Sequence, residues 1–504
     1  MPSSREVDYD ALEASTNIGD ITNDTYNQYI LRSLRDGDGE LSRLLICEGS
    51  YEDGEYHPES SEELGWLGHF AKNSVHLEEF GVCERDAFNN CSQQSIDKFF
   101  EAIGKCNRIR KLEFLLLNDL IEIMHKLHPA IKNNSITHWS SDECYLGEMA
   151  ANNIFNAFRD DMKGLEELRI NCHGEYGHDL NDDIMAGCIP SLAACPGMRK
   201  LHLISLGLSI NSGGALSAVL PQMTALNELN LGGNLIGNDG VEVLIRGLAD
   251  CNHLHSLRLY DNRIDDDGLE MLVQGLPVII DTLDLTKNEI TLARQLPLLR
   301  FKVLDLLFND LSPDSPRVIA ASLTNPECHL EELSFHAYNI GDEGAAILAS
   351  GLRNNQRLTK LAILATRNAI TETGWNEFLP ILCDATSINA THGSNHTLQS
   401  LGFYPYVNYV PRDVRTMLEL NHRKDKNLVA ARKILQTHHH LDMRPLFEWK
   451  LIMLPYVVAW LERFAASQLD LKLSSIYEFA RSMPMEVVDG VAGEKKGKKR
   501  TRDN

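Results

Sequence analysis

Apolar residues recur along the chain in a nine-residue frame, with apolar side chains at the first, fourth and sixth places and asparagine at the ninth. Four consecutive copies begin at Leu226, Leu254, Ile280 and Phe301 and read LNELNLGGN, LHSLRLYDN, IDTLDLTKN and FKVLDLLFN. Apolar side chains at alternating places favour a short strand. A pattern that returns at a fixed period is the signature of a repeat architecture. At 504 residues, the chain is therefore expected to form an elongated array rather than a single core.

The same frame extends towards both ends of the chain, mostly with a period of about 28 residues, which lies in the range of solenoid repeats. The gap between Ile109 and Leu165 is two periods long and contains a degenerate copy that begins at Ile136 and has Cys144 at the asparagine place. We therefore count thirteen copies. Besides the four consecutive copies and the degenerate one, the other eight copies begin at Leu41, Leu77, Ile109, Leu165, Met198, Leu330, Leu358 and Leu398.

The segments between the frames also repeat and are typical of helices, as in IGNDGVEVLIRGL, IDDDGLEMLVQGL and IGDEGAAILASGL. Each has Asp or Asn where a cap would accept backbone N–H groups, then apolar residues at helical spacing and a glycine near the end. One strand–helix unit cannot bury its own apolar face, so neighbouring units must stack. The predicted fold is an α/β solenoid with a curved parallel inner sheet, outer helices and an α-helical C-terminal cap.

Two spacings depart from this period. The unit from Ile280 to Phe301 is shorter than the others and contains Pro297, so we expect its outer helix to be lost or reduced. The spacing from Leu358 to Leu398 is longer than one period and carries the polar stretch DATSINATHGSNHT, which predicts a loop extension.

The repeat pattern and the composition together divide the chain into four segments. We predict an acidic polar N-terminal segment over residues 1–40, about thirteen repeats over 41–410, a helical C-terminal cap over 411–488 and a disordered basic tail over 489–504.

A strand–helix period of this length, with Asn or Cys closing the strand, resembles the ribonuclease-inhibitor-like class of leucine-rich repeats between Leu41 and Tyr404. The resemblance implies a non-enzymatic scaffold or regulator that binds a protein through the concave sheet face. The class also includes activators of the small GTPase Ran, which is the alternative function, and modules of innate receptors. Ran-directed members carry a long acidic stretch after their repeats, whereas a helical cap and a basic tail follow here. The ending, with PLFEW and YEFARSMPMEVV, resembles the C-terminal extension of repeat proteins from marine microalgae.

The charge and composition of the chain limit which partners it can bind and where in the cell it can be located. The formal net charge is −23, which argues against nucleic acid as the main partner and favours a protein partner with a basic surface. No stretch approaches the roughly 18 consecutive apolar residues of a membrane span, and the first residues lack the pattern of a secretory signal. Together with eleven singly scattered cysteines, this predicts a cytoplasmic and/or nuclear location.

A basic cluster closes this otherwise acidic chain. Such a cluster is typical of a segment read by a nuclear-import receptor or bound by an anionic surface, and the alternative is a solvated tail. Its residues are Lys495, Lys496, Lys498, Lys499, Arg500 and Arg502.

The remaining places of each strand frame point to the concave face, because strand side chains alternate. Most are polar or charged, including Lys200, Glu228, Asn230, Arg258, Asp284, Asp305, Glu332 and Lys360. Aromatic and apolar residues among polar neighbours are candidate binding hot spots, although they can also pack along the sheet. The candidates are Tyr260, Leu307, Phe308, His336, Leu364 and Tyr404.

Other conspicuous residues have structural interpretations. The asparagines of the frame are expected to satisfy backbone groups where the strand turns away. Cys106, Cys195 and Cys251 each stand three residues before a frame and are expected to be small buried residues. The run from His438 to His440 is expected to be exposed to solvent. No phosphate loop, nucleophile elbow or zinc-helix motif occurs, so we expect no catalytic residue, no cofactor and no metal ion.

Overall fold

The structure is a computed structural model that describes residues 8–37, 39–49, 54–84, 86–172, 179–294, 298, 300–338, 340–365, 369–403 and 410–438. The chain forms two compact units, unit 1 within residues 1–311 and unit 2 within residues 312–504. Among the described residues there are fourteen strands, and thirteen of them lie on the predicted frames. The predicted α/β leucine-rich-repeat solenoid is therefore confirmed.

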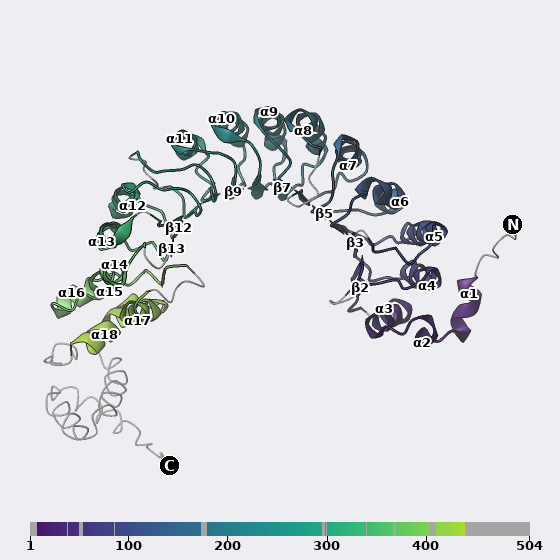
Figure 1. The fold of residues 1–504 in the computed structure, drawn as a ribbon, viewed down its shortest axis with the longest axis horizontal. Helices are drawn as coiled ribbons and strands as arrows, with labels where there is room; N and C mark the ends of the chain where they lie inside the picture. Colours follow the sequence, from purple (N-terminus) through teal and green to yellow (C-terminus); the bar gives the residue numbers. More distant parts are fainter. Residues whose placement is uncertain are drawn as a thin grey trace, which may run out of the picture. The chain divides into compact units, whose positions relative to one another are not determined.

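Unit 1 contains one parallel sheet whose strands follow chain order except at its first edge, where β2 lies outside β1. The strands line the inner side of the unit (Figure 1). They are β1 (Arg43–Ile46), β2 (Glu55–Tyr56), β3 (Glu79–Cys83), β4 (Lys111–Leu115), β5 (His138–Asp142), β6 (Glu167–Asn171), β7 (Lys200–Ile204), β8 (Glu228–Asn230), β9 (Ser256–Arg258), β10 (Thr282–Asp284) and β11 (Val303–Leu306).

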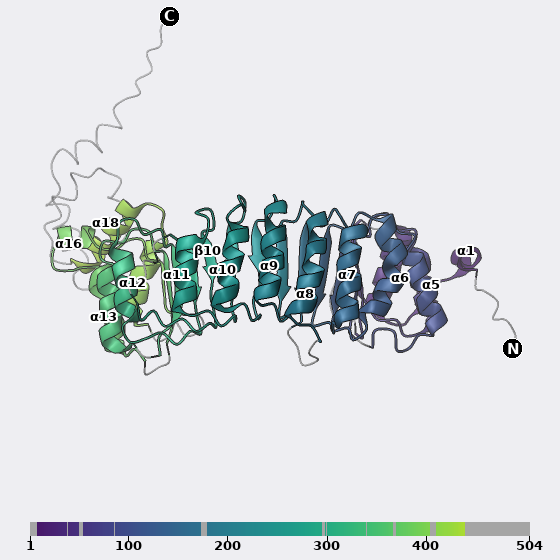
Figure 2. The ribbon, with the colours of Figure 1, turned by 90° about the horizontal axis from the view of Figure 1, so that it is seen from above.

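The helices of unit 1 form one outer layer, in which α5 to α11 lie side by side (Figure 2). They are α1 (Tyr9–Leu12), α2 (Ile18–Ile21), α3 (Thr25–Asp36), α4 (Ser61–Ala71), α5 (Gln93–Ile103), α6 (Leu120–Asn133), α7 (Glu148–Asp160), α8 (Asp182–Cys188), α9 (Ile210–Val219), α10 (Gly237–Leu248) and α11 (Asp266–Gly275). Short 3₁₀ turns are η1 (Glu13–Ser15), η2 (Ile189–Ala194) and η3 (Leu220–Gln222).

The apolar places of the frame stack in register between sheet and helices. Leu229, Leu257, Leu283 and Leu304 are consecutive backbone partners on β8 to β11, and all four are fully buried. Each such side chain removes apolar surface from water only because the next repeat covers it. The predicted cysteines Cys106, Cys195 and Cys251 are likewise buried, which confirms their structural interpretation.

The frame asparagines join neighbouring repeats, as predicted. The side-chain amide of Asn262 donates to the carbonyls of Leu231 at 2.9 Å and Tyr260 at 3.0 Å, and its oxygen accepts from the Ile236 N–H at 3.2 Å. Equivalent bonds are made by Asn234, Asn288 and Asn309. These buried amides pair backbone groups that the turn after each strand would otherwise leave without partners.

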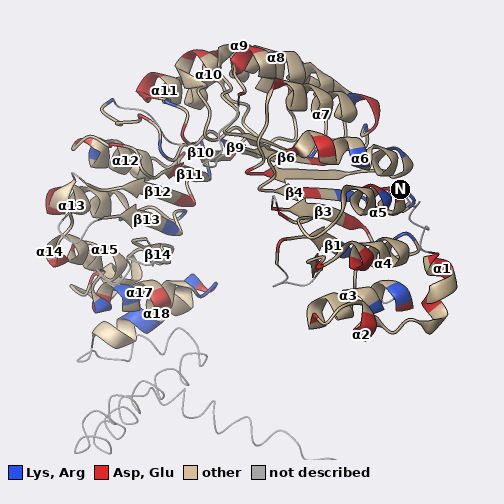
Figure 3. Cartoon of the chain, turned by 45° about the vertical axis from the view of Figure 1, so that its right-hand side comes forward, with Lys and Arg blue, Asp and Glu red and all other residues tan. Residues whose placement is uncertain are grey.

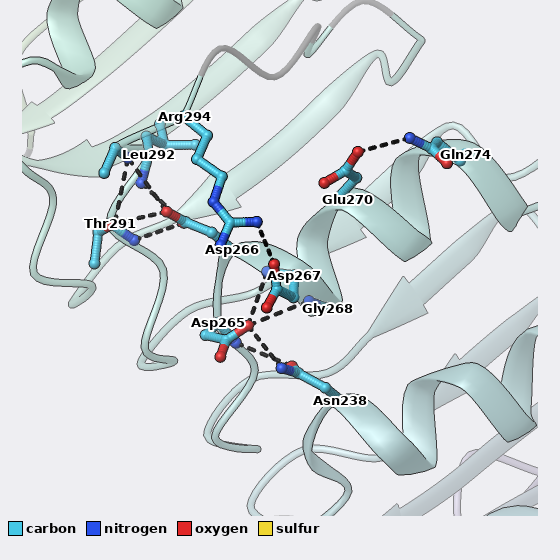
Figure 4. A network of polar contacts seen from close by, with 11 residues as sticks. Asn238, Asp265, Asp266, Asp267, Gly268, Glu270, Gln274, Thr291, Leu292 and Arg294 are labelled. Atoms are coloured by element: carbon cyan, nitrogen blue, oxygen red, sulfur yellow. Dashed lines mark hydrogen bonds and ion pairs between the residues drawn. The ribbon is translucent and has the colours of Figure 1, made fainter.

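The short unit between β10 and β11 has no helix among its described residues, so the predicted loss of the outer helix is confirmed there. The Asp266 carboxylate holds the start of this loop by accepting from the Thr291 N–H and the Leu292 N–H, both at 2.9 Å, and from the Thr291 hydroxyl at 2.6 Å (Figure 4). These bonds lower the pKa of Asp266, although burial opposes the shift. A side chain of the preceding repeat thus orders a loop that lacks its own helix.

The expected helix caps are confirmed only in part. Asp265 accepts from the N–H groups of Asp267 and Gly268 and caps α11 (Figure 4). In contrast, α10 has no side-chain cap, and Asn238 instead accepts from the Asp265 N–H of the next repeat at 3.3 Å. The polar residue after the turn therefore caps its own helix in one repeat, as Asp265 does, and bonds the next repeat in another, as Asn238 does.

An N-terminal cap covers the first repeat, which the sequence pattern did not predict. Helix α3 buries Ile30, Leu31 and Leu34 and packs against α4 and β2. Beneath it, the buried Glu63 carboxylate accepts from the Asn27 amide and the Tyr56 hydroxyl, both at 2.8 Å. Burial raises the pKa of Glu63, and these hydrogen bonds oppose the shift.

Unit 2 repeats the same architecture on a smaller scale. Its parallel strands are β12 (Glu332–His336), β13 (Lys360–Leu364) and β14 (Ser400–Leu401), and Leu333, Leu361 and Leu401 stack in register. Its helices are α12 (Ser315–Thr324), α13 (Gly341–Gly351), α14 (Glu372–Asn376), α15 (Leu379–Leu382), α16 (Ile388–His392), α17 (Arg412–Asn421) and α18 (Lys426–Thr437). The predicted extension before β14 contains α16.

Helices α17 and α18 begin the C-terminal helical region, and the rest of the predicted cap lies outside the described residues. Lys433 on α18 is fully buried and donates to the carbonyls of Leu382 at 2.6 Å and Asn395 at 3.0 Å. Next to it, His438 is half-buried, and its Nε2 lies 2.7 Å from the Thr391 hydroxyl, so the expected exposure was wrong for this residue. These contacts fix α18 on the extension.

Replacing Asn262 by Ala should lower the free energy of unfolding by about 2 to 4 kcal/mol, because the buried Ile236 N–H loses its partner and the carbonyls of Leu231 and Tyr260 each lose one of two donors. Urea unfolding of the full chain measures the loss. The exposed Asn252→Ala is the matched control and should change stability by less than about 0.5 kcal/mol. Equal effects of the two substitutions would contradict the structural role of Asn262.

The contribution of Lys433 should depend on pH. Burial lowers its pKa from 10.5 to about 7, so between these values the unfolded chain binds a proton that the folded chain does not. Stability should therefore rise with pH across this window, by up to about 1.4 kcal/mol per unit. The stability difference between wild type and Lys433→Met, measured by urea unfolding, should shift towards wild type from pH 7 to pH 9.5. A constant difference, as expected for the exposed Lys424→Met, would contradict this.

Candidate functional site

The inner strand face consists of the third, fifth and seventh places of each frame, which lie opposite the buried apolar places. In unit 1 it presents a polar, largely charged surface, and residues of both signs occur on the strands (Figure 3). Because the strands are held in register by the core beneath them, these side chains stand at fixed spacings of about 4.8 Å from strand to strand.

Most carboxylates of this face already have cationic partners on neighbouring strands. Exposed pairs of this kind contribute little stability but hold both side chains in place. The pairs are Arg43 with Glu79 at 2.9 Å, Arg169 with Asp142 at 2.9 Å, Lys200 with Glu167 at 3.0 Å, and Arg258 with Glu228 at 3.1 Å. The face is therefore a set of paired charges rather than a uniformly acidic field.

Tyr260 stands over the backbone of Gly232, which follows β8. A Cβ placed on Gly232 would overlap Cζ of the tyrosine, so the ring occupies the space that glycine leaves. Burial raises the pKa of the hydroxyl, and the opposing influences are Arg169, a hydrogen bond with Asn230, and Arg258. The half-buried ring is thus fixed by a glycine below it and by polar groups around it.

Leu307 and Phe308 follow the end of β11, two strands from Tyr260. Leu307 is buried, with 7% of its surface exposed, whereas Phe308 is 55% exposed. Phe308 has a φ of +54°, and the corresponding residues Asp261 and Lys287 are also left-handed, at +53° and +57°. This turn carries Phe308 to the edge of the sheet, beyond the strand itself.

In unit 2, the structure brings His336 and Leu364 together as backbone partners at the ends of β12 and β13. His336 is buried and stacks on the exposed Tyr338 at a centroid distance of 3.7 Å, whereas Leu364 is half-buried. Burial lowers the pKa of His336. Tyr404 and the tail from Lys495 to Arg502 lie outside the described residues, so their predicted roles in binding and nuclear import stay predictions.

A small apolar patch, which the sequence pattern did not predict, lies at the start of this face. Leu45, Cys47, Cys83 and Leu115 pack together from β1, β3 and β4. Contact with Cys83 and burial raise the pKa of the Cys47 thiol. Apolar residues at the fifth and seventh places of the first frames were the signal that could have indicated it.

The family model described as Leucine Rich repeat matches residues 222–244 and 250–273, which contain β8 and β9. The frame and the strand–helix alternation of these two repeats recur in both units. The chain is a leucine-rich-repeat protein. Its period is that of the ribonuclease-inhibitor-like class.

Part of this leucine-rich-repeat chain is similar in sequence to a known mouse protein. Over 97 residues it is 36% identical to the mouse (Mus musculus) protein named NACHT, LRR and PYD domains-containing protein 4E, a match that covers 19% of this chain and 9% of that protein. The chain thus spans less than a tenth of that relative's length.

Among solved structures, the chain is similar to an internalin (inlF) from Listeria monocytogenes, with a TM-score of 0.40 and 15% identity over 72% of this chain and 94% of that one. It is also similar to the C-terminal domain of tropomodulin from Caenorhabditis elegans, with a TM-score of 0.22 and 19% identity over 30% of this chain and 85% of that one.

The described part of this leucine-rich-repeat protein holds no cluster of three His, Cys, Asp or Glu side chains suited to a metal ion. None of its described helices combines the length and apolar character needed to cross a bilayer. The comparisons identify no catalytic family.

Gly232→Ala should destabilise the protein by about 1 to 3 kcal/mol, because the new methyl group overlaps the Tyr260 ring. In a Tyr260→Ala background the same substitution should have almost no effect, and urea unfolding of the four variants gives the coupling energy. Gly197→Ala, where no atom lies within 4 Å of the new Cβ, is the matched control. Additive effects would show that the ring does not rest on Gly232.

Proposed function

We propose that this chain is a non-enzymatic protein-binding scaffold that engages a folded protein through its inner strand face. The observation that carries the proposal is the placement of Tyr260, a half-buried aromatic ring that stands among charged side chains and is held over Gly232. Aromatic side chains surrounded by polar groups are typical centres of protein interfaces.

The paired charges support the same proposal. The Arg258–Glu228 and Arg169–Asp142 pairs hold long side chains in one arrangement before any partner arrives. A partner then loses less affinity to the ordering of side chains than it would on a flexible surface. The formal net charge of −23 adds long-range attraction for a partner with a basic surface.

Two further apolar side chains near the ends of their strands provide contact area. The exposed Phe308 in unit 1 stands at the eighth place of its frame, next to the inner face, and the half-buried Leu364 in unit 2 stands at the seventh place, as Tyr260 does in its own frame. We propose Tyr260, Phe308 and Leu364 as anchors. Leu307 and His336, which are buried, contribute mainly to the packing beneath them.

The test is affinity purification of the tagged full-length chain from its own cells, beside the Tyr260→Ala/Phe308→Ala/Leu364→Ala variant. The control variant carries Tyr26→Ala/Met149→Ala/Val278→Ala, which removes three exposed side chains, on α3, on α7 and after α11, from outside the inner face. A partner should be recovered by the wild type and the control and lost by the inner-face variant. With the purified partner, the Kd should rise at least 30-fold, which corresponds to about 2 kcal/mol. Equal binding by all three proteins would exclude the inner face as the interface.

A further inference from the structure

The groups around Tyr260 are arranged by charge in a way that indicates what a partner must present. We name as the Tyr260 site the side chains of Arg169 on β6, Asn230 on β8, Arg258 on β9, Tyr260 after β9, and Asp284 on β10. The two arginines and the asparagine lower the pKa of the tyrosine hydroxyl, whereas Asp284 raises it. The site therefore has a positive and a negative side.

On the positive side, both guanidinium groups are only partly used. Arg258 forms an ion pair with Glu228, in which Nη2 lies 3.1 Å from the carboxylate. Arg169 donates from Nε and Nη2 to a single oxygen of Asp142 at 3.0 and 2.9 Å. Their side chains are 44% and 39% exposed. A guanidinium has five N–H donors, so each retains donors that can reach a ligand from the solvent side.

On the negative side, Asp284 accepts from the Thr286 N–H at 3.0 Å through one oxygen. It lies in register between Arg258 on β9 and Asp305 on β11. Because Arg258 leans to Glu228 on the other side, no ion pair to Asp284 is formed within the described part of the chain. Its second oxygen can accept from a cation supplied by a ligand.

We propose that the Tyr260 site binds a surface loop of a partner protein that sets a carboxylate against Arg258 and a lysine or arginine against Asp284. The ring of Tyr260 packs under the segment between these two charges. This inference rests on the proposed function and adds the chemistry of the partner to it. A nucleic acid fits less well, because Asp142, Glu228 and Asp284 stand beside the arginines and repel successive phosphates.

The experiment selects random 12-residue peptides by display on the immobilised full-length chain. The enriched peptides should share one acidic and one basic residue. For a synthetic winner, Kd should rise at least tenfold with Tyr260→Ala, with Arg258→Ser and with Asp284→Lys. The loss of peptide affinity caused by Asp284→Lys should be reversed when the basic residue of the peptide is replaced by Glu.

The matched controls are Arg246→Ser and Glu242→Lys, which alter an exposed ion pair on the outer helix α10 and should leave Kd unchanged. Peptides that depend on Tyr260 but not on Arg258 or Asp284 would overturn this inference and leave the proposed function standing. Peptides indifferent to all three inner-face substitutions would count against both. Failure to enrich any peptide, or stronger binding of a 20-nucleotide single strand than of the peptides, would also overturn the inference.

Discussion

The buried side-chain amide at the end of four consecutive strand frames, those of β8 to β11, is the interaction on which this part of unit 1 depends. Each repeat must turn sharply after only a few strand residues, and that turn would leave backbone N–H and carbonyl groups buried without partners. Asn234, Asn262, Asn288 and Asn309 pair these groups and reach into the preceding repeat at the same time. In these repeats one side chain therefore secures both the local geometry and the contact between repeats, and it does so beside leucines that stack in register.

Because the sheet is rigid, the side chains of its inner face are held at fixed positions relative to one another. On such a support, oppositely charged residues at neighbouring places meet within a row, as Arg258 and Glu228 do. The inner face thereby acquires a fixed pattern of donors and acceptors without the acidic field that the net charge of the chain suggests. Tyr260 gains its position in the same way, because a neighbouring strand has a glycine at the place where the ring lies. The chemistry that the inner face presents is then a property of adjacent repeats rather than of any one repeat.

Particular residues show how much of the structure the repeat pattern predicted. The alternation along the frame correctly separated Leu257 and Leu259, which are buried, from the exposed Arg258 between them. The same rule placed Leu307 and His336 with Tyr260, yet both are buried. Helix α3 went unpredicted because its apolar residues belong to no repeat, although they cover the first repeat's core.

The sequence by itself determined the repeat, its strand and helix periods, the lack of a helix among the described residues between β10 and β11 and the structural task of the asparagines, because each depends on residues within one period or its immediate neighbour. Only the tertiary structure decided which inward charges are paired, that Tyr260 rests on Gly232, and that Lys433 is buried against the carbonyls of Leu382 at the end of α15 and Asn395 in the extension. These features depend on distances between residues of different repeats. Side-chain reach and burial set those distances, and neither follows from the order of residues within a frame.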